Sequence, residues 1–349
     1  LLFFAKRIYT FVPLYDTKKE LLMTTDDYPA DMSNHVRDPK IFKKNEKYYM
    51  VLGARDVEGV GMILLYESTD LKNWTYKNRI TTPQKFGYMW ECPDLFEMDG
   101  QLYIICCPQG VETKGIDYEN VHQVTAMKLD YDFDTDEYEI TDIKLFDRGF
   151  DFYAPQSFED ESGRRILIGW MGIPDADYTN PTEEAGWQHA LTIPRELSVR
   201  DGKLIQEPIE ELKQLRSEDK AVCTFCYGQT IIMQNAIYEA VVDFKRCREM
   251  VMTLREGITL SYKDNILTLN LGVYGSGRST RKVRLEKLEH LQIFADTSSL
   301  EIFVNHGEEV FTTRIYNHYG RLLINGECSG IMTVYPLKSF EIEGGRHEE

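Results

Sequence analysis

The sequence predicts an all-β protein: a β-propeller followed by a β-sandwich. Three observations support this prediction. A strand-rich unit recurs along the first part of the chain. The composition is rich in residues that favour strands, with 21 Tyr and 17 Phe among 349 residues. The pattern of strands and turns then changes near residue 218, as expected where a second domain begins.

The repeat covers residues 37–55, 91–109 and 153–171. Each segment has a Pro, a Phe three residues later, a polar turn and a second β-rich run. Further strand candidates, "GMILLYESTDLKNWTY" and "VTAMKLDYDFDTDEYEI", follow the first two segments. Self-similarity near 50 residues with about four strands per unit is typical of a propeller. A β-sandwich with chance similarity is the alternative.

A weaker fourth unit, "WQHALTIPRELSVRDGKLIQEP", covers residues 187–208. Three clear units and one weak unit are few for a closed ring of blades. The chain also starts with a strand-like run, "LLFFAKRIYTFVPLYDT", that is a poor signal peptide. We therefore expect the first blade to be largely missing from this chain.

The domain prediction divides the chain into three parts. Residues 1–207 form an incomplete propeller, 208–218 a linker helix and 219–349 a C-terminal β-sandwich. The linker "PIEELKQLRSE" has apolar residues at helical spacing. After it, runs such as "LQIFADTSSLEIFVNHGEEVFTTRIY" alternate in hydrophobicity around a Gly-containing hairpin turn, which is typical of a sandwich.

Composition excludes several function classes. The formal net charge of −17 disfavours binding to nucleic acid or anionic membranes, and no apolar run approaches the roughly 20 residues that span a bilayer. An odd number of cysteines, seven, without regular spacing favours a reducing compartment, and we expect a cytoplasmic protein. The seven His residues are scattered, and no Gly-rich phosphate loop is present, so we expect no metal and no cofactor. A homo-oligomer is possible, because it would cover the edges of an incomplete ring.

The repeat itself points to a site. The first strand of every propeller blade lines the central channel, so the residues just before each aligned Pro lie at equivalent places. This register brings Asp38 and Glu91 to one end of one funnel. Two carboxylates among Arg, Trp and Tyr side chains suit glycosidic bond cleavage, in which one carboxyl is a protonated acid. We expect Arg37 to keep Asp38 ionised, and Trp90 and Cys92 to favour a protonated Glu91. The alternative is that Asp38 and Glu91 are ordinary charged residues, exposed to solvent at the starts of strands on the rim.

Aromatic residues near the third unit supply flat apolar faces for sugar rings. They are Phe152, Tyr153 and Trp170. Asp151 lies just upstream of the aligned position. We therefore include Tyr153, Trp170 and Asp151 among the candidate sugar contacts.

Several motifs, in order, resemble glycoside hydrolase family 32, the β-fructofuranosidases. They include "HVRDPK", "MWECPDLF" and "FYAPQSFEDESGRRILIGWMG". The resemblance runs from about residue 20 to 345 and implies a five-bladed propeller followed by a sandwich. It implies that Glu91 is the acid/base and Asp38 the transition-state stabiliser. Arg37 would position Asp38, and Asp151 and Trp170 would contact the sugar. Arg37, Tyr153 and Cys92 complete our set of candidate substrate-binding residues. The implied activity is hydrolysis of terminal β-fructofuranosyl bonds in sucrose, sucrose 6-phosphate or a short fructan.

One departure from the family is plain. The family's nucleophile is the Asp of an N-terminal "NDPNG"-type motif, which this chain does not contain. A retaining glycosidase needs that carboxylate to form its covalent intermediate. Three explanations stay open: residues absent from the printed chain, a truncated product, or a non-catalytic relative.

Two rival functions follow. One is a sugar-binding relative that lacks the nucleophile. The other is a related five-bladed glycosidase acting on arabinan or xylan, which the C-terminal sandwich and the "ECPD" context disfavour. The sequence leaves the choice between sucrose and sucrose 6-phosphate open.

Overall fold

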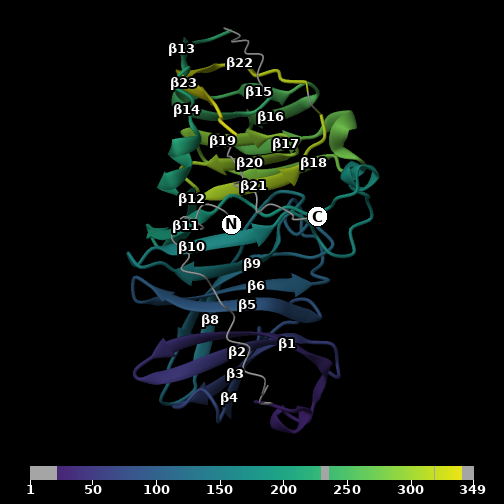
Figure 1. The fold of residues 1–349 in the computed structure, drawn as a ribbon, viewed down its shortest axis with the longest axis vertical. Coiled ribbons are helices and arrows are strands. Elements are labelled where there is room, and N and C mark those ends of the chain that lie inside the picture. Colours follow the sequence, from purple (N-terminus) through teal and green to yellow (C-terminus); the bar gives the residue numbers. More distant parts are fainter. Residues whose placement is uncertain (1–21, 229–235, 318, 340–349) are drawn as a thin grey trace, which may run out of the picture.

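The structure is a computed structural model, and it describes residues 22–228, 236–317 and 319–339. Its strands form five antiparallel sheets (Figure 1). Three four-stranded sheets come first along the chain, and a six-stranded and a five-stranded sheet follow. In Figure 1 the last two lie at the top, and the sheet β1–β4 lies at the opposite end of the molecule. No helix in the described ranges is long and apolar enough to cross a membrane.

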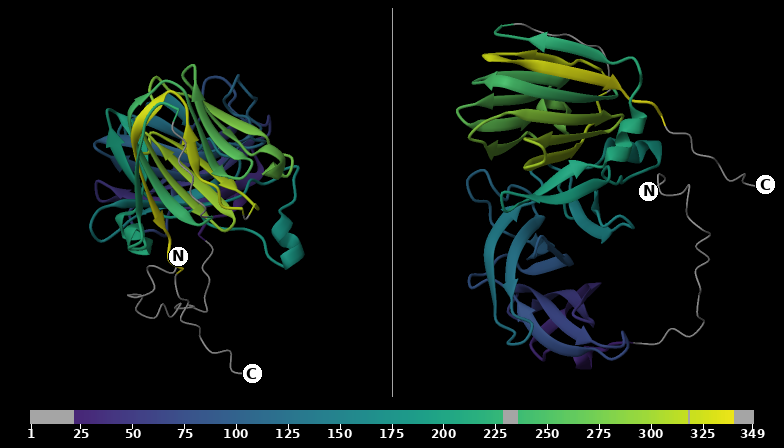
Figure 2. Two further views of the ribbon diagram at one scale, coloured as in Figure 1. Left: turned by 90° about the horizontal axis from the view of Figure 1, so that it is seen from above. Right: turned by 90° about the vertical axis from the view of Figure 1, so that its left-hand side faces the viewer.

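Each four-stranded sheet is a meander in which consecutive strands pair, as in a propeller blade. Blade 1 contains β1 (Met32–Lys44), β2 (Lys47–Asp56), β3 (Gly61–Ser68) and β4 (Thr75–Ile80). Blade 2 contains β5 (Met89–Met98), β6 (Gln101–Gln109), β7 (Thr125–Tyr131) and β8 (Tyr138–Leu145). Blade 3 contains β9 (Tyr153–Glu159), β10 (Arg165–Trp170), β11 (Arg195–Arg200) and β12 (Lys203–Pro208). The blades succeed one another along an arc (Figure 2).

The repeat therefore marks the inner hairpin of each blade, as predicted. The prediction of a separate, weaker fourth unit at 187–208 was wrong. Its strands β11 and β12 are the outer hairpin of blade 3, since β11 pairs directly with β10. The long connection between β10 and β11 separates the two hairpins of blade 3 in the sequence, so the sequence did not show that they form one blade. In the other two blades the outer hairpin follows the inner one within about 20 residues.

The remaining strands face each other as two sheets of a sandwich. The six-stranded sheet has the order β13 (Ala221–Phe225), β23 (Cys328–Pro336), β14 (Tyr238–Cys247), β19 (His290–Asp296), β20 (Ser299–Val304) and β21 (Glu309–Arg314). The five-stranded sheet has the order β18 (Thr280–Arg284), β17 (Ile266–Asn270), β16 (Ile258–Lys263), β15 (Met250–Arg255) and β22 (Leu323–Asn325). Alternate residues of both sheets fill one large apolar core.

The described residues also contain four 3-10 helices: η2 (Thr25–Asp27), which precedes β1, and η3 (Pro181–Ala185), η4 (Glu210–Leu215) and η5 (Gly272–Gly275), which lie between strands. The helix η4 lies within 208–218, where the sequence predicted a linker helix. Its Leu212 is buried together with residues of blade 3 and the sandwich. The domain boundaries at 207 and 219 stay predictions.

A buried polar network joins blade 3 to the sandwich. Arg195 of β11 is fully buried and pairs with Asp147, at 3.1 Å, and with Glu301 of β20, at 2.7 Å. Its guanidinium also lies over the rings of Phe152 and Phe303. Because a buried charge is costly unless it is paired, this network favours one relative position of the two parts.

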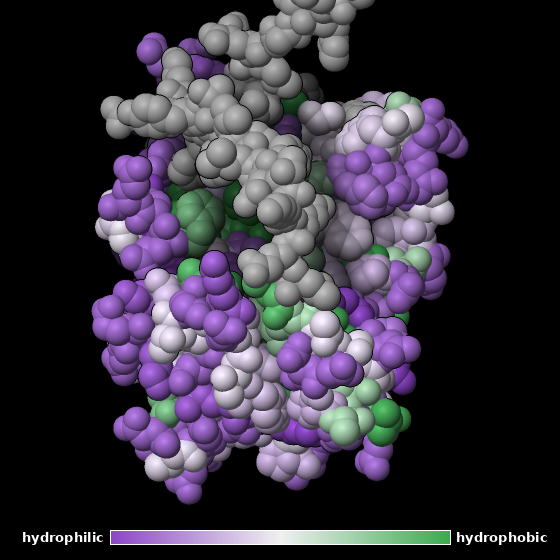
Figure 3. Space-filling view, turned by 60° about the horizontal axis from the view of Figure 1, so that its bottom comes forward, coloured by the Kyte–Doolittle hydropathy of each residue, from purple (hydrophilic) through white to green (hydrophobic). Residues whose placement is uncertain are grey.

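Hydrophilic side chains prevail on the part of the face in Figure 3 that is drawn in colour, in agreement with the formal net charge of −17.

Candidate active site

The first strands of the three blades share an irregular backbone position. The residue before the aligned Pro has a positive φ in each: 61° at Asp38, 49° at Cys92 and 47° at Ala154. The ladder to the second strand shifts register at the same place in every blade. Left-handed backbone at a non-Gly residue is uncommon and costs on the order of 1 kcal/mol. Such bulges re-aim side chains next to functional sites.

The residues immediately before these bulges meet at one point. Arg37 of β1 donates to Glu91 Oε1 from Nε, at 2.9 Å, and from Nη2, at 2.5 Å. The hydroxyl of Tyr153, on β9, donates to Glu91 Oε2 at 2.8 Å. Side chains from the first and third blades thus hold the carboxylate of the second. The Glu91 side chain is 16% exposed.

A close approach of two strands allows this contact. Gly53 of β2 lies opposite Arg37 in the ladder, and a Cβ on Gly53 would lie 2.2 Å from the Trp90 carbonyl oxygen. Only a glycine at this position lets β5 come so near to blade 1. The sequence pattern "VLGAR" gave no sign of this requirement.

The fourth donor to Glu91 was missed by sequence reasoning. Gln109, at the end of β6, donates to Glu91 Oε2 at 2.9 Å. It occupies the last position of the second repeat segment, beside the strand that carries Glu91. This position in the repeat could have indicated a site residue, because a residue on the strand that pairs with the Glu91 strand can point into the same funnel.

Asp38 lies next to Glu91, as the repeat predicted. Its Oδ2 accepts a hydrogen bond from the Cys92 backbone N–H at 2.9 Å, and the Cys92 thiol lies 3.6 Å from the same oxygen. Cys92 directly follows Glu91 in the chain. The structure thus brings together Arg37, Asp38, Glu91, Cys92 and Tyr153, which we call the Glu91 cluster. Their catalytic and binding roles stay predictions.

The predicted surroundings of two carboxylates in the cluster, Asp38 and Glu91, were wrong. Arg37 pairs with Glu91, not with Asp38, because successive residues of a strand point in opposite directions. For the same reason Trp90 does not flank the Glu91 carboxylate. Trp90 is fully buried among blades 1 and 2 and donates from Nε1 to the Phe86 carbonyl. Glu91 therefore has a polar environment with four hydrogen bonds.

Asp151 does not join the Glu91 cluster, which corrects its predicted place. It is 1% exposed, and its Oδ2 accepts bonds from the Thr313 hydroxyl, at 3.0 Å, and from the Arg314 backbone N–H, at 2.8 Å. Arg278 and Tyr178 also bond to this carboxylate. Asp151 therefore ties blade 3 to the sandwich.

The aromatic residues have different surroundings. Tyr153 is 3% exposed, and burial, followed by nearby Cys107 and Glu91, raises the pKa of its hydroxyl. Trp170 is half-buried, contacts Tyr153 edge-on with centroids 6.5 Å apart, and donates to His189 Nδ1 at 3.1 Å. Phe152 is buried against Arg195, so its predicted role as a sugar platform is wrong. No group of three or more His, Cys, Asp or Glu residues suited to a metal occurs among the described residues.

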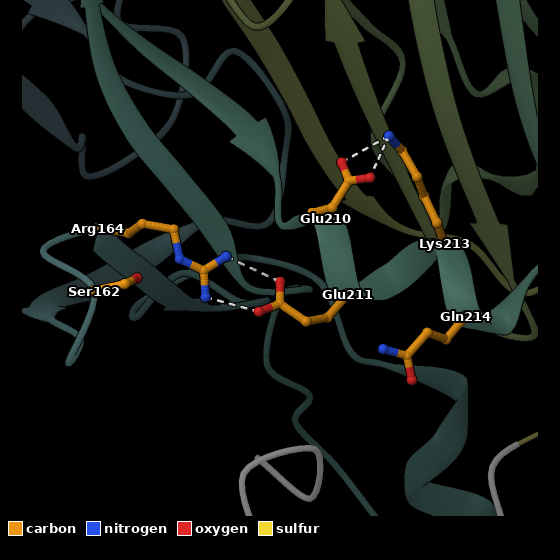
Figure 4. A pocket seen from close by; sticks show the side chains of 6 residues that line it. All are labelled: Ser162, Arg164, Glu210, Glu211, Lys213 and Gln214. Atoms are coloured by element: carbon orange, nitrogen blue, oxygen red, sulfur yellow. Dashed lines mark hydrogen bonds and ion pairs between the residues drawn. The ribbon is translucent and has the colours of Figure 1, made fainter.

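Three hollows among the described residues, with volumes of about 650 to 700 Å³, are large enough to hold a sugar. One of them, of about 700 Å³, lies at the β7–β8 turn of blade 2 and shares no residue with the Glu91 cluster. Another, of about 700 Å³, lies beside η4 (Figure 4). Its charged side chains already pair with each other: Arg164 with Glu211 at 2.7 Å and Lys213 with Glu210 at 2.6 Å. It shares no residue with the Glu91 cluster, so we assign no site there. The third, of about 650 Å³, begins at Gly110, next to Gln109, and reaches the sandwich.

Comparisons with known proteins identify the family. The family model described as "Glycosyl hydrolases family 32 N-terminal domain" matches residues 9–208, and its C-terminal counterpart matches residues 217–334. The chain belongs to glycosyl hydrolase family 32. The predicted fold class, a β-propeller followed by a β-sandwich, is thereby confirmed.

Individual relatives agree with this assignment. The sucrose-6-phosphate hydrolase of Staphylococcus xylosus is 35% identical over 334 residues, which cover 90% of this chain and 67% of that protein. The solved sucrose-6-phosphate hydrolase of Lactobacillus gasseri has a TM-score of 0.80 and 28% identity, covering 89% of this chain and 68% of that one.

A third relative was solved with a sugar. The Bombyx mori family 32 β-fructofuranosidase, as a mutant in complex with sucrose, has a TM-score of 0.74 and 30% identity, covering 87% of this chain and 66% of that one. The chain therefore spans about two thirds of the length of these relatives.

Proposed function

We propose that the protein hydrolyses terminal β-fructofuranosyl bonds of sucrose or sucrose 6-phosphate by a retaining, two-carboxylate mechanism. The observation that carries this proposal is the Glu91 carboxylate, held by side chains of three blades beside Asp38. The names of the relatives support the substrate class: sucrose-6-phosphate hydrolases in bacteria, and an insect enzyme solved with sucrose.

Glu91 is the proposed acid/base. Protonated, it donates to the glycosidic oxygen as the bond breaks, and its carboxylate then activates the water that completes hydrolysis. The four donors from Arg37, Gln109 and Tyr153 fix both of its oxygens. A fixed carboxyl group is placed for proton transfer without reorganisation during the reaction.

Asp38 is the proposed transition-state stabiliser. The Cys92 N–H orients one of its oxygens, which leaves the other for fructose hydroxyls. Hydrogen bonds that sugar hydroxyls donate to a carboxylate gain strength as positive charge develops on the ring. The covalent step needs a further carboxylate, and the N-terminal family motif stays its expected source.

The experiment that tests this function is hydrolysis of sucrose and sucrose 6-phosphate by the full-length protein. Release of fructose together with glucose or glucose 6-phosphate supports the proposal. Sugar binding without hydrolysis supports the alternative, a non-catalytic sugar-binding relative.

The compartment and the assembly are part of the proposal. Cys92, Cys106, Cys107, Cys223, Cys247 and Cys328 are free thiols, in keeping with the proposed cytoplasmic location. Cell fractionation tests this location, and size-exclusion chromatography with light scattering tests for a homo-oligomer.

A further inference from the structure

The cleft of about 650 Å³ lies between the propeller and the sandwich. One wall is the β6–β7 connection, residues 110–121, and another is the β10–β11 connection at 173–178. The sandwich contributes residues 277–281. The cleft is thus built from both halves of the chain, and none of its lining residues belongs to the Glu91 cluster.

Two arginines lie side by side in this cleft. Arg278 and Arg281 both contact the ring of Phe150, with guanidinium carbons 5.9 and 4.2 Å from its centroid. Arg278 is 7% exposed. Two neighbouring cations in a half-buried place are unusual in a chain with a formal net charge of −17.

Their charges are incompletely balanced. Arg278 pairs through Nη1 with Asp151, but its Nη2 has no hydrogen-bond partner among the residues that the structure describes. Arg281 bonds to the Asn120 side chain and to backbone carbonyls, and no described carboxylate lies within 4.0 Å of its guanidinium. Burial lowers the pKa of Arg281, which reflects the cost of a desolvated cation.

The outer part of the cleft is negatively charged. Four exposed carboxylates line it: Glu112, Glu119, Asp175 and Asp177. Glu119 acts on Arg281 through its charge, although it makes no ion pair with it within 4.0 Å. Carboxylates suit sugar hydroxyls, whereas the neighbouring guanidinium groups suit a phosphate. A ligand with a phosphate at one end and hydroxyls at the other matches this distribution of charge.

The cleft is also linked to the Glu91 cluster. The Gly110 backbone N–H donates to His122 Nδ1 at 3.3 Å, and His122 Nε2 lies 3.0 Å from Asp175 Oδ2. Gly110 follows Gln109, which bonds to Glu91. The two walls of the cleft are therefore tied together beside the proposed acid/base.

We propose that this cleft binds the phosphate of a phosphorylated hexose, with Arg281 in contact with the phosphate and Arg278 adding positive charge. The phosphate has two possible sources, the leaving hexose of a bound sucrose 6-phosphate or a free hexose phosphate. The first source rests on the proposed hydrolase function, and the second does not.

The test is calorimetric titration of the full-length protein with glucose 6-phosphate, glucose and inorganic phosphate. We expect glucose 6-phosphate to bind at least about tenfold more tightly than glucose, and Arg281→Gln to remove most of that difference. Arg281→Lys, which keeps the charge, should retain part of it. The matched control is Lys282→Gln, which loses the same charge on the opposite face of β18 and should bind like the wild type.

Kinetics distinguish the two sources. If the substrate supplies the phosphate, Arg281→Gln lowers the ratio of kcat/KM for sucrose 6-phosphate to that for sucrose by about tenfold. If binding depends on Arg281 but this ratio does not change, the ligand is a free hexose phosphate. Equal Kd values for wild type and Arg281→Gln, or equal losses in Arg281→Gln and Lys282→Gln, overturn the proposal. A protein that hydrolyses no fructofuranoside refutes the hydrolase function, and the titration still decides the phosphate site.

Discussion

At the residue scale, the Glu91 carboxylate is the feature that sets the site apart. It accepts hydrogen bonds from three other side chains on three blades. Sequence reasoning found Glu91, Asp38, Arg37 and Tyr153 because each is tied to the Pro that marks the repeat. It missed Gln109, which lies at the other end of a segment, and it misplaced Asp151, whose partners come from the distant sandwich.

Replacing Glu91 by Gln should lower kcat on sucrose by about a hundredfold or more, the usual contribution of a general acid. Activity on an aryl fructoside should fall far less, because a good leaving group needs little protonation. Steady-state kinetics on both substrates checks this, with Glu97→Gln, an exposed change on the same strand, as the control. Equal losses on the two substrates would remove Glu91 from the role of acid.

The change Asp38→Asn should lower kcat far more than it raises KM. The amide keeps the size of the side chain but loses the charge that strengthens its bonds to sugar hydroxyls in the transition state. Full kinetic curves on sucrose separate the two constants. A change confined to KM would mean that Asp38 only binds substrate.

At the element scale, the structure of each blade depends on its turns and on the bulge in its first strand. The repeat of Pro, Phe and polar turn let the inner hairpins be predicted from sequence, because that pattern is local. The bulges were not predictable, because Asp38, Cys92 and Ala154 have positive φ values and none of them is the glycine that usually marks such a backbone. The outer hairpin of blade 3 was misassigned, because its partner strand lies across a long connection.

The β9–β10 turn should respond to acid. The Asp160 side chain accepts bonds from Ser162 and Arg164, and these bonds, the Ser162 hydroxyl first, lower its pKa from 3.8 to about 2. A lowered pKa stabilises the fold above pH 3.8, and this stabilisation is lost as pH falls through about 2. Asp160→Asn should therefore flatten the fall in melting temperature between about pH 4 and 2. An unchanged slope would show that the turn is not responsible.

At the scale of the whole molecule, polar contacts at the junction hold the propeller against the sandwich. Arg195, Asp147 and Glu301 form its buried centre. Burial raises the pKa values of both carboxyl groups, which reflects how much each depends on Arg195 to stay charged. The two-domain architecture was predictable from the change of strand pattern. This network was not predictable, because Arg195 and Glu301 are over 100 positions apart in the sequence.

Arg195→Met should lower the free energy of unfolding by about 3–5 kcal/mol, because it leaves two buried carboxylates without a counter-charge. Chemical denaturation followed by fluorescence measures this loss. Arg248→Gln, an exposed position between β14 and β15 of the sandwich, is the control. A loss below about 1 kcal/mol for Arg195→Met would mean that water reaches the junction.

The most direct test of the account is hexose release from sucrose and sucrose 6-phosphate by the purified full-length protein. The account predicts release of fructose with glucose or glucose 6-phosphate from at least one of them, and release at least about a hundredfold slower from the Glu91→Gln variant. A folded protein that binds these sugars and hydrolyses neither would contradict the account, and the Glu91 cluster would then be a sugar-binding site.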